Sequence, residues 1–252
     1  MSIIIALLIF SLIVLFHEFG HFLLAKKNGI TVVEFSLGMG PRLLSFDKGG
    51  TKYSWKLLPF GGSCMMLGED EGTMEPGAFA AASVWARISV IAAGPVFNFI
   101  LAFVLSLFII GSIGYDKPVI LQVSDGYPAA EAGLKEGDIV KKINHSNIHV
   151  AREVTNYVTF HQKQSVTMTV ERDGKDITVQ MDPVANESGR YIFGISCSSN
   201  YREKCGILGT LKYSAYEVKY LIRSTLLSLK ELLTGGLGVK DLSGPVGVVD
   251  AI

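Results

Sequence analysis

The sequence predicts a membrane α-helical protein with a β-rich region between two apolar helices and a small soluble α+β domain after the second helix. Three observations predict this class. Two long stretches are almost free of charged residues. The segment between them contains runs of β-branched and aromatic residues that are separated by glycine. In residues 117–200, short strand-like patterns alternate with helical ones. The 252 residues are 49% hydrophobic and 18% charged, whereas a soluble protein of average composition carries about 25% charged residues.

The first apolar stretch, residues 2–25, contains three strongly polar side chains, those of His17, Glu18 and His21. About 20 apolar residues are enough to cross the hydrocarbon core of a bilayer. The alternative is a cleaved signal peptide, but the stretch lacks the basic start and the small-residue cleavage site of such peptides. We therefore expect residues 1–25 to form a retained first transmembrane helix.

The second apolar stretch, residues 88–115, has no Asp, Glu, Lys, Arg or His and is predicted to form the second transmembrane helix. No basic side chain precedes the first stretch, whereas residues 26–87 contain Lys26, Lys27, Arg42, Lys48, Lys52, Lys56 and Arg87. The positive-inside rule places this segment on the cytoplasmic side of the membrane. The N-terminus and everything after residue 115 are then extracytoplasmic, in a multi-pass protein of the inner or plasma membrane.

Residues 26–87 are predicted to hold more than a simple loop. Residues 31–46 and 51–67 are rich in β-branched and aromatic side chains, and Gly49 and Gly50 form a turn signal between them. This pattern predicts an antiparallel β-hairpin. Because non-helical backbone at membrane depth is tolerated only against protein or a wet cavity, we expect the apolar hairpin to pack against the spans at the membrane.

Residues 117–200 are predicted to form a self-contained domain of ordinary size. Its expected helices are residues 128–134 and 151–161, and its expected strands are residues 119–123, 139–143, 166–172, 177–181 and 191–196. Residues 206–234 repeat apolar side chains every three or four positions, with charged residues on the opposite face. Segment 206–252 is therefore expected to begin with an amphipathic helix at an interface, not with a span.

Charge and cysteine content exclude several classes of protein. The formal net charge is zero, so nothing indicates a nucleic-acid partner. The three cysteines contain no CxxC pair, which argues against a disulfide framework and against a thiolate zinc site. A bond between Cys197 and Cys205 stays open if both face an oxidising compartment.

The chemistry of the chain is indicated by His17-Glu18-Phe19-Gly20-His21, which fits the pattern H-E-x-x-H. Residues four apart on a helix share a face, so His17 and His21 can bind one Zn²⁺ ion. Glu18 can reach a water on that ion and take its proton, as the hydrolysis of an amide requires. An accidental match is disfavoured, because two histidines and a glutamate in an apolar span are costly unless they are paired or ligated.

The order of motifs resembles that of the bacterial site-2 proteases, a family of intramembrane zinc metalloproteases. HEFGH lies in the first span, a glycine-rich β-region follows, Ala92-Ala93-Gly94-Pro95-Val96-Phe97-Asn98 lies in the second span, and a soluble domain comes next. The resemblance implies cleavage of transmembrane segments in single-pass proteins, typically anti-sigma factors or remnant signal peptides. Glu18 would be the catalytic base, with zinc held by His17 and His21.

The same resemblance implies sites for the substrate. The family's GxG motif matches Gly38-Met39-Gly40, in a β-region thought to guide the unwound substrate. Strand addition suits this task, because main-chain hydrogen bonds demand no particular sequence. Asn98 can hydrogen-bond across the helices, either in packing or in lining the site, and is assigned with Gly38 and Gly40 to substrate binding. Gly94 and Pro95 are interpreted as ordinary helix packing.

Residues 128–138, PAAEAGLKEGD, resemble the PDZ signature of bacterial proteases. The soluble segment 117–200 is therefore expected to be an extracytoplasmic PDZ domain that binds a peptide and acts as a size filter or regulator. His145 and His149 repeat the four-residue spacing of the metal motif, but they lack an acidic neighbour in sequence. We interpret them as surface side chains.

One departure concerns the third zinc ligand, because catalytic zinc sites usually have three protein ligands. In the family this ligand is an Asp in an L-D-G sequence that follows an N-x-x-P stretch, and neither motif occurs here; Asp250 lies in another context. We expect a chain truncated before its last two spans, which would hold zinc weakly alone. The alternative is a membrane-anchored PDZ adaptor without catalytic activity. A tethered peptidase for soluble peptides is disfavoured by the position of HEFGH within the span.

Overall fold

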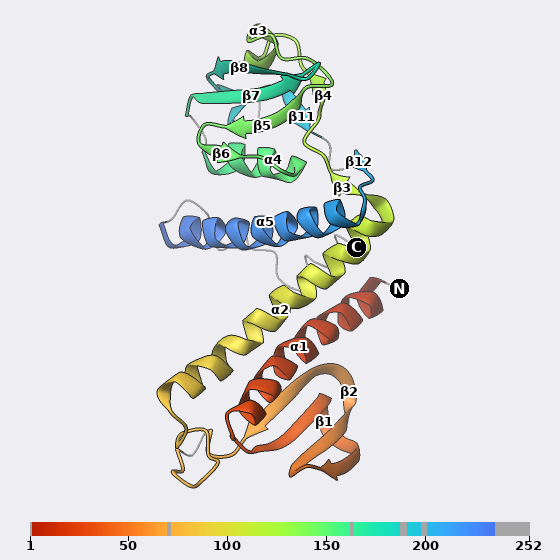
Figure 1. Cartoon of the computed structure of the whole chain (residues 1–252), viewed down its shortest axis with the longest axis vertical. Coiled ribbons are helices and arrows are strands. Elements are labelled where there is room, and N and C mark those ends of the chain that lie inside the picture. Colours follow the sequence, from red (N-terminus) through yellow and green to blue (C-terminus); the bar gives the residue numbers. More distant parts are fainter. Residues whose placement is uncertain (1, 70–71, 162–163, 187–190, 198–200, 235–252) are drawn as a thin grey trace. The chain divides into compact units, whose positions relative to one another are not determined.

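The computed structural model describes residues 2–69, 72–161, 164–186, 191–197 and 201–234 (Figure 1). The chain divides into two compact units, of which the first contains residues 1–102 and the second residues 103–238. The described elements of the first unit are α1 (Ser2–Lys27), β1 (Val32–Lys48), β2 (Thr51–Met66) and the first part of α2 (Val84–Ile113). The remainder of α2, the small β-rich domain and α5 (Ile207–Thr234) form the second unit.

The two helices α1 and α2 are long and apolar enough to cross a membrane, each with a mean hydropathy of 2.5. Helix α2 begins at Val84, four positions before the expected residue 88, because the Ser83 hydroxyl accepts a hydrogen bond from the Ala86 amide and caps the first turn. It ends at Ile113, since Gly114 adopts a φ of 91° that an L-residue avoids. Tyr115, expected in this helix, belongs instead to strand β3.

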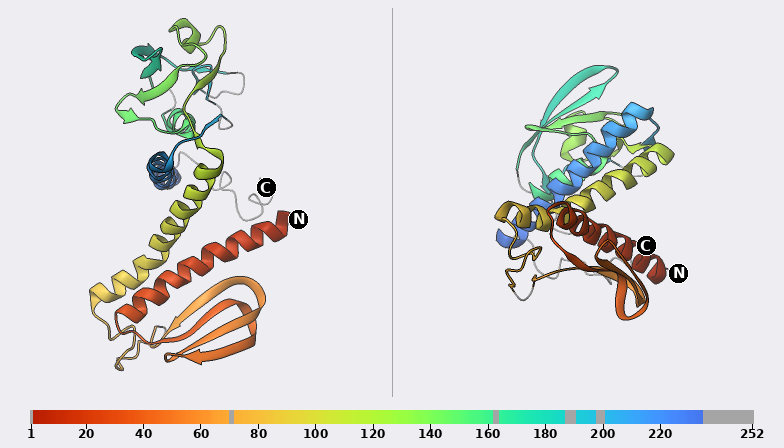
Figure 2. Two further views of the ribbon diagram at one scale, coloured as in Figure 1. Left: turned by 45° about the vertical axis from the view of Figure 1, so that its right-hand side comes forward. Right: turned by 60° about the horizontal axis from the view of Figure 1, so that its bottom comes forward.

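Strands β1 and β2 form a sheet that is more folded than the expected hairpin. Residues 34–37 pair on one side with residues 62–65 and on the other side with residues 52–55. The outer half of β1, residues 42–48, pairs with residues 51–56. The hairpin therefore folds back on itself, and its two strands supply four side-by-side segments with β1 residues 34–37 inside. The sheet lies against α1 (Figure 2).

The fold-back requires glycine at its corner. Gly38 has a φ of 87°, and a Cβ there would lie 2.3 Å from the main-chain oxygen of Leu58. Both the backbone conformation and the close approach therefore exclude other residues. The ion pair between Arg42 and Glu34, 2.9 Å long, links the outer and inner halves of β1 across the bend.

A small apolar core ties the sheet to the helices of the same unit. Its buried members are Ala25 of α1, Ile30 in the connection after α1, the sheet residues Val32, Cys64 and Met66, and Val90 of α2. Two polar contacts add to it. The Lys26 ammonium donates to the Gly49 carbonyl at 2.8 Å, and the Ser11 hydroxyl donates to the Pro59 carbonyl at 3.1 Å. The sheet is thus held at both ends of its length against α1.

The second unit contains a β-rich domain built around a four-stranded sheet with the order β6-β5-β7-β8. The bounds of its strands are Ser146–Asn147, Ile139–Ile143, Val166–Arg172 and Lys175–Met181, in that order. Helices α3 (Pro128–Glu131) and α4 (Ala151–Phe160) complete the domain, together with paired strands β4 (Ile120–Val123) and β11 (Ile195–Cys197). Two further pairs are β3 (Tyr115–Asp116) with β12 (Arg202–Glu203), and β9 (Val184–Ala185) with β10 (Tyr191–Ile192).

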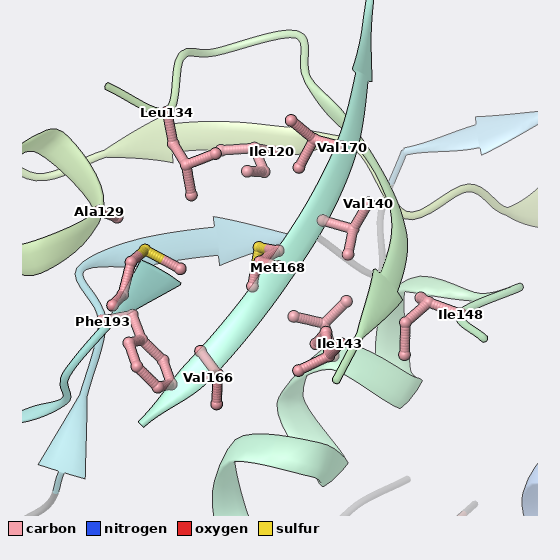
Figure 3. Close-up of a cluster of buried hydrophobic side chains, with 12 residues drawn as sticks. Ile120, Ala129, Leu134, Val140, Ile143, Ile148, Val166, Met168, Val170 and Phe193 are labelled. Carbon is pink, nitrogen blue, oxygen red and sulfur yellow. The ribbon is translucent and has the colours of Figure 1, made fainter. Parts of the chain in front are cut away.

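The core of this domain is a cluster of mostly aliphatic side chains between the sheet and the strand pair β4–β11 (Figure 3). Met168 of β7 lies at its centre and is fully buried. The expected strand 191–196 is divided between β10 and β11, because Gly194 adopts a φ of 80° and each part has a different partner strand. The expected helix 128–134 ends earlier, at Glu131, and Gly133 turns the chain with a φ of 79°.

A buried ion pair joins the turn after α3 to the sheet. Asp138 is 1% exposed and receives two hydrogen bonds of 2.7 Å from Arg172 and one of 2.9 Å from the Lys135 amide. Arg172 also donates to the Gly133 carbonyl. Burial raises the pKa of Asp138, but the hydrogen bonds from Arg172 and Lys135 outweigh it and hold this pKa below its ordinary value. The carboxylate is therefore charged at neutral pH.

We expect Arg172→Leu to destabilise the domain by about 3–5 kcal/mol, because it leaves the buried Asp138 carboxylate without its charge partner. Amide hydrogen exchange of β5 and β7 in the full-length protein measures this. The matched control is Lys141→Leu, which breaks the partly exposed pair with Glu171 between the same strands and should cost about 1 kcal/mol or less.

The same pair predicts a pH dependence. Since the folded pKa of Asp138 is depressed, its stabilisation is present above about pH 4 and is lost as the pH falls through the folded pKa. Wild-type protection should decline in this acidic range, and the decline should be smaller in Arg172→Leu. Equal hydrogen-exchange protection of the wild type, Arg172→Leu and Lys141→Leu at neutral pH would show that the Asp138–Arg172 pair does not stabilise the domain.

Candidate metal centre

The two histidines of the HEFGH motif lie on one face of α1. The rings of His17 and His21 have centroids 4.8 Å apart and meet edge to face at 80°. Both side chains are half-buried, as is that of Glu18. This is the arrangement that a four-residue spacing on a helix produces.

The Nε2 atoms of both histidines converge on α2 at Gly94. A Cβ built on this glycine would lie 2.5 Å from Nε2 of His17 and 2.6 Å from Nε2 of His21. The space in front of both nitrogens therefore exists only because position 94 has no side chain. An ion ligated by imidazole lies about 2.0–2.1 Å from the nitrogen. The donor set and the space between the two Nε2 atoms fit a zinc ion.

Nδ1 of His21, the ring nitrogen that does not face Gly94, has a partner that sets the tautomer of the neutral ring. Nδ1 of His21 lies 2.7 Å from the main-chain oxygen of Val90, also on α2. A carbonyl oxygen can only accept, so Nδ1 carries the hydrogen and Nε2 keeps its lone pair. This is the tautomer that binds metal through Nε2.

Nδ1 of His17 faces Asn98, which lies eight residues after Val90 on α2. Nδ1 of His17 lies 3.1 Å from Nδ2 of Asn98, and the Asn98 Oδ1 is buried without a hydrogen-bond partner among the described residues. The sequence interpretation assigned Asn98 to substrate binding or packing. The structure brings it to a ring of the metal motif.

The variable positions of the motif also have structural tasks. A Cβ on Gly20 would lie 2.5 Å from the main-chain oxygen of Ala93, so glycine permits the close approach of α1 and α2. Phe19 packs against Phe97 of α2, with ring centroids 5.9 Å apart. The sequence interpretation treated Gly94 as ordinary packing and did not single out Gly20, because neither task is visible without the partner helix.

The last part of β2 passes beside Glu18. A Cβ on Gly62 would lie 3.7 Å from Cγ of Glu18, and it would lie 2.9 Å from the main-chain oxygen of Ser36. Gly62 was missed by the sequence analysis, although the Gly61-Gly62 doublet was a visible signal. Gly38 and Gly40 both have positive φ values, 87° and 88°, and shape the bend of the sheet.

The other residues considered as metal ligands, Asp250, His145 and His149, do not join this centre in the described part of the chain. Within the described ranges, no group of three or more His, Cys, Asp and Glu side chains is placed to hold a metal. Asp250, considered for the third ligand, lies outside the described residues. His145 is exposed, whereas His149 is half-buried and stacks on Tyr216 of α5 with ring centroids 3.7 Å apart. The expectation of a surface side chain was therefore wrong for His149, because α5 covers it.

We expect Gly94→Ala to weaken zinc binding by more than about tenfold, because the new methyl group would occupy the space in front of both Nε2 atoms. Zinc per chain after dialysis against a chelator measures the effect. Gly111→Ala is the matched control on the same helix, since its Cβ would meet only Thr210 at an ordinary 3.8 Å. Zinc retention by Gly94→Ala at the wild-type level would show that the ion does not bind there.

Comparison with known proteins identifies relatives over nearly the whole chain. The sequence profile described as Peptidase family M50 matches residues 5–251. A protein of Clostridium acetobutylicum, provisionally named a zinc metalloprotease, is 35% identical over 98% of this chain and 73% of its own length. The Bacillus subtilis protein named Regulator of sigma-W protease RasP is 29% identical over 97% of this chain and 78% of its own length.

A comparison with solved structures matches about a third of the chain. The PDZ domain of the SdrC-like protein from Listeria monocytogenes corresponds to 33% of this chain and 90% of that domain. The sequence identity is 21% and the TM-score is 0.30.

Proposed function

We propose that this chain, which belongs to peptidase family M50 and is a site-2-type zinc metalloprotease, cleaves membrane proteins. Its proposed reaction is the hydrolysis of peptide bonds within the transmembrane segments of single-pass proteins. The observation that carries this proposal is the position of the HEFGH motif inside the apolar helix α1. Peptide bonds that reach a centre at this position belong to segments that are themselves in the bilayer. Soluble peptides would instead require a motif outside the span.

In this proposal His17 and His21 bind zinc through Nε2, and Glu18 is the general base. A zinc ion bound by these histidines would supply a Lewis acid that lowers the pKa of its water to about 7 and polarises the carbonyl of the substrate. The Glu18 carboxylate takes a proton from the attacking water and delivers it to the nitrogen of the leaving amine. The tautomer of His21 set by Val90 supports the assignment, because it leaves the required lone pair on Nε2.

We assign the sheet of β1 and β2 to positioning of the unwound substrate. Segment 62–66 forms one edge of the sheet, and Gly62 in this segment lies beside Glu18. A substrate strand added to such an edge would have its main chain held by hydrogen bonds next to the catalytic base. Gly38 and Gly40 serve this role by shaping the sheet, and their contact with substrate stays a prediction.

The substrate class we propose is single-pass regulators of sigma factors and remnant signal peptides. Support comes from the name of the Bacillus subtilis relative, which describes a regulator of sigma-W. Recognition through main-chain hydrogen bonds fits such a set, because the segments share an apolar helix and little sequence.

We further propose that residues 117–200 form an extracytoplasmic PDZ domain that binds a peptide. A groove of about 510 Å³ between α4 and the strands β10 and β11 supports this role. Apolar side chains from both elements line it, among them Val154, Val158 and Ile195. The groove thus offers a strand edge beside a helix, which is the geometry that PDZ domains use.

The decisive variant is Glu18→Gln in the full-length protein purified in detergent. We expect near-stoichiometric zinc in both the variant and the wild type, because the amide keeps the shape of the site and the histidines remain. Cleavage of a panel of tagged single-pass helices should fall by about a hundredfold to ten-thousandfold, because the amide cannot take the proton. Zinc analysis and gel-based cleavage measure the two quantities.

Glu75→Gln provides the control, since it makes the same change at an exposed position outside the helices. This variant should cleave at the wild-type rate. Undiminished cleavage by Glu18→Gln would remove Glu18 from the mechanism. Zinc-dependent cleavage of soluble peptides, with no cleavage of membrane segments, would overturn the substrate class.

The proposed orientation is tested by single cysteines in a background without Cys64, Cys197 and Cys205. In whole cells, a membrane-impermeant thiol reagent should label a cysteine at Asp173 and should not label one at Gly49 until the membrane is opened. Both positions are exposed turns with positive φ, so access is not limited by packing. The reverse labelling pattern would place the domain in the cytoplasm.

A further inference from the structure

We propose that Asn98 is a positioning residue that sets the tautomer of His17 by accepting the hydrogen of its Nδ1, and is not a substrate ligand. The inference rests on the proposed function, in which His17 binds zinc through Nε2. It starts from two observations on the same side chain. The amide lies 3.1 Å from Nδ1 of His17, and its Oδ1 is buried without a partner among the described residues.

The amide of Asn98 has two orientations related by a half turn, and they have opposite chemical consequences. When Nδ2 faces the ring, it donates a hydrogen and Nδ1 must accept. The neutral imidazole of His17 then carries its hydrogen on Nε2, the nitrogen in front of Gly94, and cannot bind a metal there. Oδ1 meanwhile gains nothing, because it has no donor.

When Oδ1 faces the ring, it accepts the hydrogen of Nδ1. Oδ1 thereby gains the donor that it lacks in the other orientation. Nε2 of His17 is left with its lone pair directed into the space at Gly94. This orientation is the one compatible with zinc binding by His17, so the amide orientation and metal binding are coupled.

The contact of His21 shows the same principle with a fixed acceptor. The Val90 carbonyl, 2.7 Å from Nδ1 of His21, can only accept and needs no orientation. Val90, Gly94 and Asn98 are spaced by four residues and therefore lie on one face of α2. On this face the Val90 carbonyl accepts from His21, Gly94 leaves the space in front of both Nε2 atoms, and the Asn98 oxygen accepts from His17 in the proposed orientation.

Loss of a group that orients a metal ligand typically lowers metal affinity by about 10–100-fold. We expect this loss in Asn98→Leu, which keeps the approximate volume and removes the acceptor. Asn98→Asp keeps an oxygen facing His17 and should bind zinc at least as tightly as the wild type. The readouts are zinc affinity, by competition with a chelator, and the absorption spectrum of the Co²⁺-substituted full-length protein.

Asn28→Leu is the matched control, because it makes the same substitution at an exposed position after α1, where Asn28 donates to Leu24 and Ser89. It should leave zinc affinity and the Co²⁺ spectrum unchanged. Weak zinc binding by Asn98→Leu together with tight binding by Asn98→Asp would support the tautomer role, since both side chains keep the branched shape of the amide and only Asp keeps an acceptor for Nδ1.

A direct measurement does not depend on the folding of any Asn98 variant. In the metal-free wild type labelled with ¹⁵N-histidine, the resonances of His17, assigned by their loss in His17→Ala, should show the hydrogen on Nδ1. A hydrogen on Nε2 would overturn the inference. Zinc binding by Asn98→Leu at wild-type affinity would overturn it as well and leave the proposed function standing. If His17→Ala itself kept full zinc affinity, the proposed metal site and this inference would fall together.

Discussion

The contact between α1 and α2 at two glycines is the constraint on which the candidate site depends. Without a side chain at Gly20, the backbone of α1 can approach the main-chain oxygen of Ala93, and without one at Gly94, the histidine rings can approach the backbone of α2. Between helices in a bilayer the hydrophobic effect supplies little attraction, so close packing of small residues and polar contacts must hold them together. The crossing provides both, and the metal motif lies within it.

The polar side chains of the HEFGH motif meet polar groups of the neighbouring helix at one centre. His17, Glu18 and His21 come from α1, while α2 offers the Val90 carbonyl and the Asn98 amide. Ionisable and polar groups are costly in a span unless they have partners. Here the partners come from the neighbouring helix, which means that the site exists only when the helices are packed. Metal binding at the proposed site would therefore depend on the same contacts as helix packing.

The folded sheet of β1 and β2 solves a related problem for the backbone. Buried N–H and C=O groups of a strand are costly unless they pair. By folding back at Gly38, the hairpin pairs residues 34–37 on both sides and reduces the unpaired backbone to the outer segments. One of these edges passes beside Glu18 at Gly62. Unpaired main-chain groups of this edge thus lie where we propose that the substrate strand binds.

The sequence by itself determined the features that depend on neighbouring residues along the chain. The periodicity of side chains predicted strands 139–143 and 166–172, which are confirmed, and the four-residue spacing of His17 and His21 placed both on one helical face. The catalytic class was also within reach, because H-E-x-x-H requires only local geometry. Each of these patterns involves residues that lie within about one helical turn or within one strand.

Only the tertiary structure decided which distant residues meet. The double pairing of β1, the division of residues 191–196 between two partner strands, and the contact of Asn98 with His17 join segments far apart in sequence. Gly94 resembles any packing glycine until α1 is placed against it, and His149 resembles a surface residue until α5 covers it. Pairing partners and cavities depend on the summed packing of whole elements. Their identity is therefore a property of the folded chain and not of the local pattern.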